Sequence, residues 1–369
     1  AQNALTQTFP EAMVMEELPA PKPAHILVRG AYDAPGDAVT ADTPHFLPPL
    51  AAELPRNRLG LARWLTAPEN PLFARVTVNR LWQQMLGAGL VDTADNFGLQ
   101  GALPTHPALL DWLAHDFATH GWDVKRILRQ IALSATYRQS SQASPELLAR
   151  DPQNRLLARA PARRLSAEML RDQALAASGL LVEKLGGPSV LPYQPPGLWE
   201  EIAMGKPKYE QGTGDDLHRR SLYTFWKRTV PPPAMILFDA AERNVCTVTR
   251  QSTSTPLQAL ALLNDVQIVE AARHLGQRML REGGATSRER LTWGFRLVTS
   301  RPPSARELAL LTELHAEQLA HFVAETAATE EFNAFGATAT DGYFPAADRA
   351  AYAITAKALL NFDESLMRR

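Results

Sequence analysis

The sequence predicts a mainly α fold, a multi-helix domain with long Gly/Pro-rich loops and a few short strands. Apolar residues recur with helical spacing along most of the chain after Asn57, as in THPALLDWLAHDFATHG at residues 105–121. Capping residues begin such stretches and glycines end them, which is the usual punctuation of helices. One stretch, HILVRG at residues 25–30, has the composition of a short strand.

Several of the predicted helices have an identifiable first residue. Thr105 precedes HPALLDWLAHDF, and Asp123 precedes VKRILRQIALSATYRQ. Ser166 precedes AEMLRDQALAAS, and Ser304 with Glu307 forms the S-x-x-E pattern of a capping box. Side-chain oxygens at these positions can accept hydrogen bonds from the free amides of the first turn, so each is expected to be an N-cap.

The stretch STPLQALALLND also predicts a helix start. Thr255 at the N-cap, Pro256 at the first helical position and Gln258 at the third form a capping box with the favoured first-turn proline. The apolar residues that follow continue the helix. Asn264 and Asp265 are then expected more than two turns along it. A functional role of this stretch would lie there or in the exposed amides at the helix N-terminus, which could hold an anion.

Composition changes after residue 54. The first 54 residues contain proline clusters in PAPKP, DAPGD and TPHFLPPL, which favour extended chain and turns. We therefore expect residues 1–54 to form an extended Pro-rich arm or the end of an upstream domain. Residues 55–369 are expected to form a helical domain, for which two lobes meeting near residues 180–250 are one arrangement. Because the chain has no initiator Met, it is expected to be a fragment or a processed product.

Charge and hydropathy limit the classes of partner. The 369 residues include 38 Lys plus Arg and 39 Asp plus Glu, so the net charge of −1 creates no overall attraction to nucleic acid or to anionic membranes. We expect no nucleic-acid partner. No run of 18 apolar residues occurs, so no membrane span is expected. The first 23 residues lack the basic and apolar regions of a signal peptide.

The chain has a single cysteine, Cys246, which excludes an internal disulfide and a haem-attaching CxxCH motif in this segment. No cofactor is therefore expected in this segment. The neighbours of Cys246 in NVCTVTR alternate as in a strand, which favours a small buried residue over a nucleophile.

Standard catalytic motifs are absent from the sequence. It contains no GxGxxG, Walker A, HExxH, GxSxG or CxxC pattern. Histidines that bind zinc from one helix usually lie four residues apart. His115 and His120 are five apart, His315 and His321 are six apart, and His106 lies at a helix start. No metal site is expected.

Glu168 and Asp172 are four residues apart on one predicted helix, so both carboxylates share a face. Such a pair could hold a cation or act as an acid/base pair. Arg164 and Arg171 are near enough in sequence to form ion pairs with them instead. The ion-paired surface is the favoured interpretation.

A cluster of cations and aromatic rings in LHRRSLYTFWKRT is the best local signal of a binding site. Arginine presents a planar fork of donors to carboxylate, sulfate or phosphate groups, and aromatic faces stack on sugar rings. The Gly/Pro-rich stretch at residues 186–216 adds three aromatic residues, Tyr193, Trp199 and Tyr209. Loops of this length in a compact domain are usually functional or disordered. The candidate substrate-binding residues are Arg219, Arg220, Tyr223, Trp226, Arg228, Arg250, Tyr193 and Trp199.

The same cluster has a structural alternative. Leu222 and Phe225 could be buried in a strand whose arginines pair with Asp239 or Asp265. In the binding interpretation, these two aspartates orient the arginines or serve as acid/base groups, and they are the weak catalytic candidates.

A series of ordered blocks extends from ILVRGAYDAPGDAV to AKALLNFDESL. It includes NRLGLARWLTAPENPLFARVTVNRLWQQMLGAGLV, PTHPALLDWLAHDF, GWDVKRILRQIALSATYRQSS, RRLSAEMLRDQALAASGLL, GGPSVLPYQPPGLW, RRSLYTFWKRTVPPP and TPLQALALLND. In these blocks the chain resembles the planctomycete-secreted C-terminal domain called domain of unknown function 1553. The chain departs from the pattern at Ala241, Asn244, Ser254 and Val266, around the cationic cluster.

The resemblance implies a mainly helical domain, usually C-terminal to a second domain of unknown function and a cytochrome-c-like module. Such proteins are typically exported and linked to the breakdown of complex, sulfated polysaccharides. The expected partners are thus a polysaccharide and the upstream domains of the same protein, and haem c would belong to an upstream domain. No catalytic residue is implied for this chain.

Two hypotheses remain open. In the first, the chain is the C-terminal helical domain of an exported multidomain protein that binds or breaks down a complex polysaccharide. In the second, it is a non-catalytic structural or docking domain that supports an upstream haem or catalytic module. Convergence of the Arg219–Arg228 stretch, the Tyr193–Trp199 loop and Asp265 on one pocket would favour the first. Arginines held in saturated ion pairs would favour the second.

Overall fold

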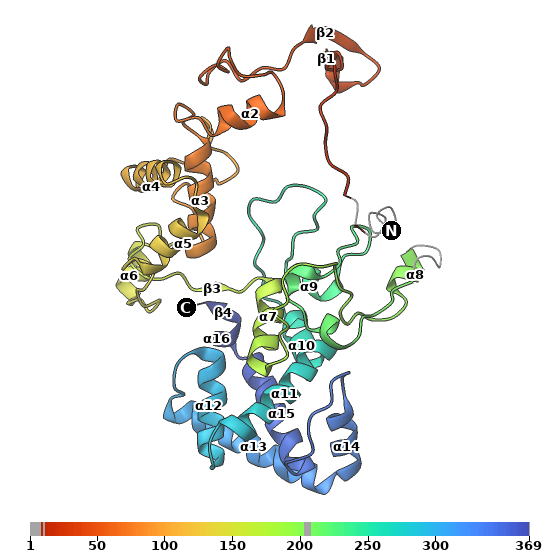
Figure 1. Ribbon diagram of the computed structural model, residues 1–369. Helices are drawn as coiled ribbons and strands as arrows, with labels where there is room; N and C mark the ends of the chain where they lie inside the picture. Colours follow the sequence, from red (N-terminus) through yellow and green to blue (C-terminus); the bar gives the residue numbers. More distant parts are fainter. Residues whose placement is uncertain (1–8, 10–11, 203–207, 369) are drawn as a thin grey trace. The chain divides into compact units, whose positions relative to one another are not determined.

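The computed structural model describes residues 9, 12–202 and 208–368. The first residues of the predicted arm and residues 203–207 of the predicted long loop lie outside the described residues. The chain divides into two compact units, residues 1–137 and 138–369. Helices dominate both units and strands are few and short, which confirms the mainly α fold (Figure 1).

Unit 1 begins with a β-hairpin and continues as four helices. Strand β1 (Ala24–Leu27) pairs antiparallel with β2 (Pro35–Val39), and the 3-10 helix η1 (Val28–Gly30) lies in the connection. The strand expected at residues 25–30 is thus confirmed for its first half. The helices are α2 (Arg58–Leu65), α3 (Phe73–Leu86), α4 (Pro107–Thr119) and α5 (Val124–Leu133).

The core of unit 1 lies where α3, α4 and α5 pack together. Each helix contributes the apolar stripe that its sequence spacing predicts. The buried side chains of these three helices include Val78, Trp82, Leu86, Leu110, Leu113, Phe117, Ile127 and Ile131. The α4–α5 connection turns at Gly121 and Trp122, which have φ of 71° and 60°.

The predicted helix starts are confirmed except for one. Asp123 accepts a hydrogen bond from the Arg126 amide, as expected of an N-cap. The N-cap of α4 is His106, whose side chain makes no capping hydrogen bond, so the prediction for Thr105 was wrong. The Thr105 amide donates instead to the Leu90 carbonyl oxygen at 2.9 Å, because this residue is held by the preceding loop.

Unit 2 contains the remaining elements, and its two short strands pair with each other antiparallel. Their residue ranges in chain order are α6 (Pro145–Arg150), β3 (Arg163–Arg164), α7 (Ala167–Ser178), α8 (Leu198–Ile202), η2 (Gly214–Leu217), η3 (Ser221–Tyr223), α9 (Pro233–Leu237), α10 (Pro256–Asn264), α11 (Val266–Glu282), α12 (Ser287–Thr299), α13 (Ala305–Ala324), α14 (Thr326–Ala334), α15 (Ala346–Leu360), α16 (Asp363–Leu366) and β4 (Met367–Arg368).

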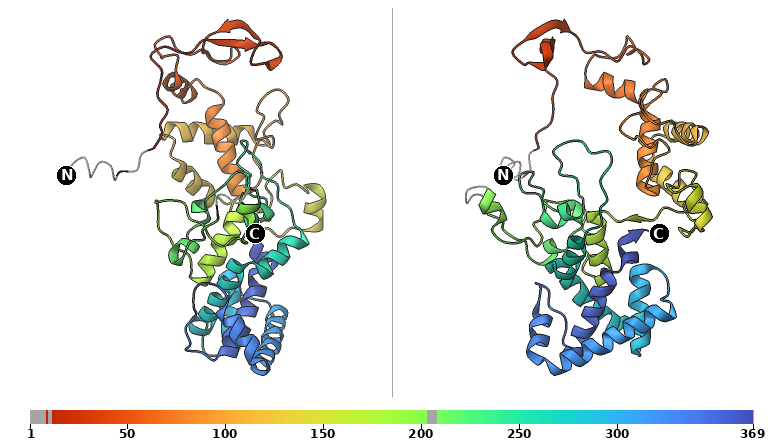
Figure 2. Two further views of the ribbon diagram at one scale, coloured as in Figure 1. Left: turned by 90° about the vertical axis from the view of Figure 1, so that its right-hand side faces the viewer. Right: turned by 180° about the vertical axis from the view of Figure 1, so that it is seen from behind.

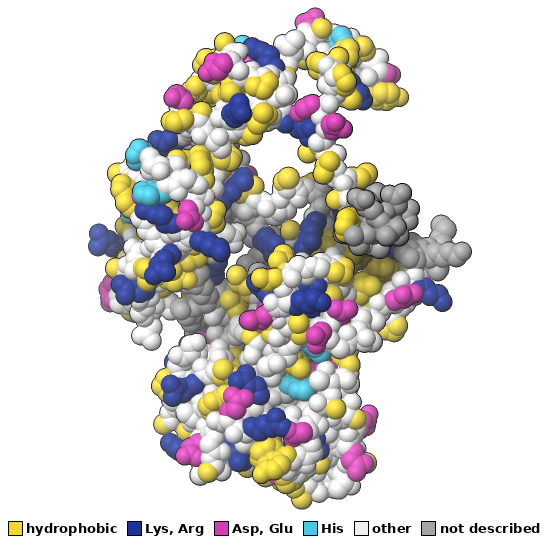
Figure 3. Space-filling view, viewed as in Figure 1, with side chains coloured by type: hydrophobic (Ala, Val, Ile, Leu, Met, Phe, Trp, Pro, Cys, Tyr) yellow, Lys and Arg dark blue, Asp and Glu magenta, His cyan; other side chains and the backbone are white. Residues whose placement is uncertain are grey.

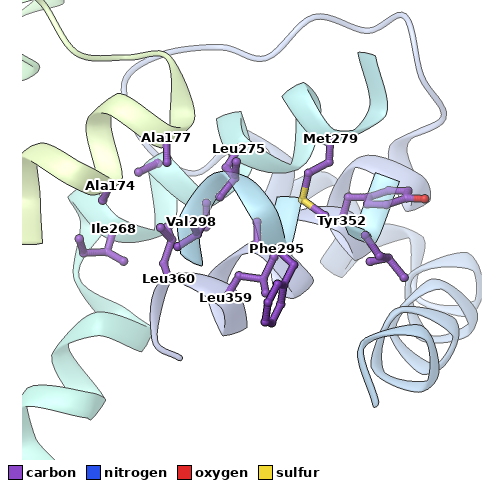
Figure 4. Close-up of a cluster of buried hydrophobic side chains, with 14 of the residues drawn as sticks. Ala174, Ala177, Ile268, Leu275, Met279, Phe295, Val298, Tyr352, Leu359 and Leu360 are labelled. Carbon is purple, nitrogen blue, oxygen red and sulfur yellow. The ribbon is translucent and has the colours of Figure 1, made fainter. Parts of the chain in front are cut away.

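The core of unit 2 forms around α11 and α15, which run alongside each other (Figure 2). Leu275, Met279, Phe295 and Tyr352 are among its fully buried side chains (Figure 4). Gly276 allows the two backbones to approach closely, since a Cβ at this position would lie 2.6 Å from the Ala353 amide nitrogen. Helices α7, α12 and α13 pack around this pair, so α11 is buried along most of its length.

The predicted capping box at Thr255 is confirmed. The Thr255 hydroxyl accepts from the Gln258 amide at 3.3 Å, and the Gln258 side chain accepts from the Thr255 amide at 3.1 Å. The helix is shorter than expected, however. It ends at Asn264, and Asp265 is both the C-cap of α10 and the N-cap of α11. The break moves Asp265 from the predicted helix interior to a junction between helices.

Residues 241–255 form bends and irregular chain rather than the strand expected around NVCTVTR. Cys246 is exposed, so the prediction of a small buried residue was wrong. Asp239, at the start of this segment, has φ of 62° and accepts hydrogen bonds from the Thr253 amide at 2.7 Å and from the Thr253 hydroxyl. The segment is therefore held at its ends by polar contacts rather than by a sheet.

Candidate functional site

A pocket in unit 2 lies between α7, α9, α10, α11 and the extended chain at residues 192–193. Its wall is mainly apolar, and four polar side chains interrupt it, those of Arg171, Thr224, Asp265 and Gln267. We call it the Asp265 pocket. The cavity volume is about 70 Å³. The apolar part of the wall comprises Ala167, Leu170, Pro192, Tyr193, Pro232, Ala234, Met235, Phe238, Ala261, Leu262 and Ile268.

Asp265 is placed in the pocket by the break between α10 and α11. Its carboxylate accepts a hydrogen bond from the Gln267 amide at 2.9 Å, which is the capping contact that begins α11. Burial raises the pKa of the Asp265 carboxyl, although the α11 amides and Arg171 oppose the shift. A carboxyl whose pKa is raised by burial in a pocket is a feature of binding and catalytic sites.

Arg171 lines the pocket, but its guanidinium already donates hydrogen bonds to other groups of the protein. Its Nη1 donates to the Arg219 carbonyl oxygen at 2.8 Å and to the Ser221 hydroxyl at 3.3 Å. Its Nη2 donates to the Leu217 carbonyl oxygen at 2.7 Å and to the Gln267 side-chain oxygen at 3.0 Å. Burial lowers the pKa of Arg171 to about 10, so the side chain remains charged at neutral pH. Arg171 thus links α7 to residues 217–221 and to Gln267 of α11, and these contacts fix the pocket wall.

Two polar groups at the wall have no hydrogen-bond partner within the described residues. They are the side-chain nitrogen of Gln267 and the hydroxyl of Thr224, and both atoms are buried. The oxygen of the Gln267 amide faces Arg171, so only its nitrogen is unpaired. Buried polar groups are normally satisfied. Two unpaired groups in one pocket therefore indicate hydrogen-bonding capacity for a ligand.

A buried hydrogen-bond network supports the wall behind Tyr193. The Tyr193 hydroxyl donates to the Glu270 carboxylate at 3.1 Å and accepts from the Ala337 amide at 2.8 Å. Glu270 also accepts from the Thr338 amide at 2.7 Å and lies 2.9 Å from His218 Nε2. Burial raises the pKa of Tyr193 to about 12, so its phenol is neutral and can act as the donor. This network fixes the Tyr193 ring at the pocket.

The structure places Arg219 and Tyr223 away from the pocket lining. The Arg219 guanidinium donates to the carbonyl oxygens of Lys184 and Pro188 at 2.9 Å each, and it lies 3.7 Å above the Tyr223 ring centroid. The Tyr223 hydroxyl accepts from the Gly186 amide. Both side chains therefore hold the 184–188 loop in place.

Arg220 is half exposed and lies 3.6 Å from Asp172, which also accepts from the Ser221 amide. Arg250 donates to both oxygens of Glu168, at 3.0 and 2.8 Å. The Glu168–Asp172 face is therefore ion-paired, as favoured, although the partner of Glu168 is Arg250.

The remaining candidates are spread over the surrounding segments. The Trp226 indole donates to the Glu242 carbonyl oxygen, and Arg228 is exposed. Trp199 is buried with Tyr209 edge-on to it, and the Lys227 ammonium lies 4.3 Å from its ring centroid. The structural alternative, a strand in which Leu222 and Phe225 are buried, was also wrong. The Leu222 side chain is 68% exposed and that of Phe225 is 43% exposed.

The pocket thus brings together two of the residues proposed from the sequence, Tyr193 and Asp265. Arg171, Thr224 and Gln267 were not among the proposed binding residues. Gln267 could have been found, because it and Glu270 are polar residues three apart on a helix whose flanking positions are apolar, a pattern that indicates buried polar groups. Thr224 has no comparable signal in the sequence.

The described residues contain no group of three or more His, Cys, Asp or Glu side chains placed to hold a metal ion. None of the described helices combines the length and the apolar character that crossing a membrane requires.

The comparison with protein families identifies the chain. The model of the family described as PSD1, protein of unknown function (DUF1553), matches residues 57–315. The match contains all of α2 to α12, which include every helix that lines the Asp265 pocket, and the first half of α13. No curated protein and no solved structure matches the chain. Because the family model covers well over half of its length, the chain belongs to the PSD1 (DUF1553) family.

Proposed function

We propose that this domain binds a hydroxyl-bearing carbohydrate through the Asp265 pocket, and takes part in the binding or breakdown of a complex polysaccharide. The observation that carries the proposal is the set of unpaired groups at the wall, the Gln267 amide nitrogen and the Thr224 hydroxyl, beside the Asp265 carboxyl. An amide nitrogen donates, a carboxylate accepts and a hydroxyl does both. Together they match the mixed donor and acceptor character of neighbouring sugar hydroxyls.

A neutral sugar suits this pocket better than a sulfated one. Arg171 already donates to two backbone carbonyls, a hydroxyl and an amide oxygen, so little of its donor capacity is left for an anion. A sulfate ester would also lie beside the Asp265 carboxyl, and like charges repel strongly where water is excluded. The mainly apolar wall is suited to the C–H face of a sugar ring.

The size of the pocket limits which part of the ligand enters. Its cavity volume of about 70 Å³ is far below the roughly 300–1,000 Å³ of pockets that enclose a whole small molecule. The pocket therefore admits one edge or substituent of a sugar ring. A chain end or a side branch of a polysaccharide has such a group free, so these are the parts we expect to bind.

Calorimetric titration of the 369-residue chain with neutral and sulfated oligosaccharides tests the proposal. Thr224→Val keeps the side-chain shape and removes the hydroxyl, so we expect it to weaken binding of the neutral ligand about tenfold, as the loss of one hydrogen bond implies. Thr229→Val makes the same chemical change at an exposed position outside the pocket and serves as the control. Failure of all neutral oligosaccharides to bind, or equal loss in both variants, would contradict the proposal.

The docking hypothesis is the second candidate, and one observation favours it. The arginines of the predicted cationic cluster support the protein itself, since Arg219 is bound to loop carbonyls and Arg220 lies beside Asp172. In this reading the domain does no chemistry and supports an upstream haem or catalytic module. Co-purification of the chain with its upstream domains, expressed separately, together with no carbohydrate binding, is the result that would select it.

The proposal places this domain at the C-terminal side of an exported multidomain protein. It rests on the family resemblance, which implies export and a cytochrome-c-like module upstream. The full-length gene is the direct test. An export signal and a CxxCH motif before residue 1 would support this placement, and a full-length product without either would contradict it.

A further inference from the structure

A second recess in unit 2 runs along the exposed side of α12. Its lining consists of Gly283, Arg288, Glu289, Thr292, Trp293, Arg296, Leu297 and Ser300. We call it the α12 groove. Its volume is about 620 Å³, within the range of ligand-binding sites, and it shares no lining residue with the Asp265 pocket.

The periodicity of α12 places one arginine at each end of the groove. Arg288, Thr292 and Arg296 follow one another at intervals of four residues, so they lie along one side of the helix. Eight residues of helix span roughly 12 Å, which separates the two arginines along the groove. Trp293 and Leu297, each one position further on, form the apolar strip beside them.

Both arginines are uncommitted. Arg288 and Arg296 are exposed, and neither forms an ion pair with any described residue. In contrast, Arg278 on the neighbouring helix α11 donates to Glu282 at 2.7 and 2.8 Å. The groove therefore offers two free guanidinium groups, and each can form a bidentate pair with an anion.

The one acid in the groove is already engaged. Glu289 belongs to the capping box of α12 and accepts from the Thr286 amide at 2.9 Å, the Ala285 amide at 3.0 Å and the Thr286 hydroxyl at 3.0 Å. These hydrogen bonds lower the pKa of Glu289, and they turn its charge toward the helix N-terminus. Glu289 is thus not the partner that Arg288 lacks.

Helix stability does not account for Arg288. It lies in the first turn of α12, where the positive end of the helix dipole makes a cation unfavourable. Arg296 lies in the last turn, where a cation is favourable, so only one of the two has a structural explanation. An anionic partner would account for both.

The floor of the groove favours a sugar chain as that partner. Trp293 is half-buried, because it packs against the core of unit 2 and the Arg278 guanidinium lies 5.2 Å from its ring centroid. These contacts hold the indole in place, and the part of it that lines the groove offers an aromatic surface to a sugar ring. A nucleic acid would need a broader positive surface, but cationic and anionic side chains are interspersed over the face shown in Figure 3.

We propose that the α12 groove binds an anionic polysaccharide, with Arg288 and Arg296 pairing with two acidic substituents along the chain and Trp293 stacking on a sugar ring between them. The proposal extends the carbohydrate binding proposed above and rests on it for the class of ligand. It adds a second, charge-dependent contact surface, so neutral and acidic parts of one polysaccharide would be recognised by different parts of unit 2.

Binding of a sulfated oligosaccharide and of its desulfated form to the intact chain tests the proposal, with intrinsic tryptophan fluorescence and calorimetry as readouts. We expect the sulfated form to bind more tightly, and its affinity to fall as salt rises. The double variant Arg288→Ala/Arg296→Ala should lose at least tenfold in affinity. Arg306→Ala removes an exposed arginine outside the groove on α13 and is the matched control, with thermal melting to verify folding.

Three outcomes would overturn the proposal: equal binding of the desulfated form, equal loss in the Arg306→Ala control, or tighter binding of an acidic peptide or a DNA strand. The pocket variant Thr224→Val separates the two proposals, because it should retain sulfate-dependent binding. If neutral binding through the pocket fails while sulfate-dependent binding needs Arg288 and Arg296, the groove stands without the pocket. The converse result removes the groove alone.

Discussion

His218 Nε2 lies 2.9 Å from the Glu270 carboxylate, and both side chains are buried, Glu270 completely. The pair joins two distant parts of the chain, because His218 follows η2 whereas Glu270 lies on α11. Glu270 receives two further hydrogen bonds, from Tyr193 and from the Thr338 amide. One carboxylate thus holds together three segments, among them the one that carries Tyr193 to the Asp265 pocket.

Replacing Glu270 is expected to destabilise unit 2 strongly. Glu270→Ala leaves the donors of Tyr193, Thr338 and His218 without their acceptor in a buried place, which typically costs about 3–5 kcal/mol. Glu313→Ala removes an exposed carboxylate on α13 and should change the unfolding free energy by less than about 0.5 kcal/mol. Urea unfolding followed by circular dichroism measures both. A small effect at Glu270 would mean that the network adds little to stability.

Acid should weaken the ion pairs that Arg301 makes. Its guanidinium donates to Glu307 at 2.7 and 3.0 Å and to Glu364. The hydrogen bonds from Arg301 to Glu307 lower the pKa of Glu307 to about 2. Since the folded pKa is below the unfolded value of about 4.3, this stability is present above pH 4.3 and is lost as pH falls toward 2. The pair is partly exposed, so the contribution should be about 1 kcal/mol and decrease with salt.

Glu307→Gln isolates that contribution, because glutamine preserves the capping box with Ser304. The difference in unfolding free energy between the native chain and the variant should be largest at neutral pH and vanish near pH 2. A difference that does not change between pH 7 and pH 2 would show that the ion pair is not its source.

The parts of this fold that were predictable are those that depend on neighbours in sequence. The Thr255–Gln258 and Ser304–Glu307 capping boxes form as expected, because each requires only residues three positions apart. Asp265 shows the limit of such reasoning. Its Asp-Val-Gln sequence can either continue a helix or begin a new one, and the capping bond to the Gln267 amide decides for the second.

The pocket was less predictable, because its key contacts join residues far apart in the chain. Arg171 donates to carbonyl oxygens at positions 217 and 219 and to the side chain of Gln267. Every residue has a backbone carbonyl, so the sequence does not indicate which of them accepts a hydrogen bond from an arginine. The hydrogen bonds of Arg171 and Arg219 to backbone carbonyls could therefore not be inferred. Tyr193 and Asp265 line the pocket, whereas the proposed arginines Arg219, Arg220 and Arg250 contact loop carbonyls or carboxylates of the protein itself.

The Thr255 capping box should contribute measurably to stability. Thr255→Ala removes the acceptor of the Gln258 amide, and the loss of a threonine N-cap typically costs about 1 kcal/mol. Ser254→Ala changes the preceding exposed residue and serves as the control. Thermal unfolding of the two variants gives the comparison, and equal melting temperatures would contradict a role for the cap.

The pH dependence of Asp265 provides the last prediction, and it has the opposite sign to that of Glu307. Burial raises the pKa of the Asp265 carboxyl above its unfolded value of about 3.9, so between the two values the folded chain binds more protons than the unfolded chain. The stability from this group is therefore present at acid pH and is lost as pH rises. Asp265→Asn removes the charge and retains a good N-cap for α11. Its unfolding free energy, relative to the native chain, should increase from acid to neutral pH.

Asp265→Ala loses the cap as well, so it should be less stable than Asp265→Asn by about 1 kcal/mol at every pH. Urea unfolding between pH 4 and pH 8 distinguishes the two effects. A relative stability of Asp265→Asn that falls as pH rises would show that the pocket favours the ionised carboxylate, and it would contradict the raised pKa.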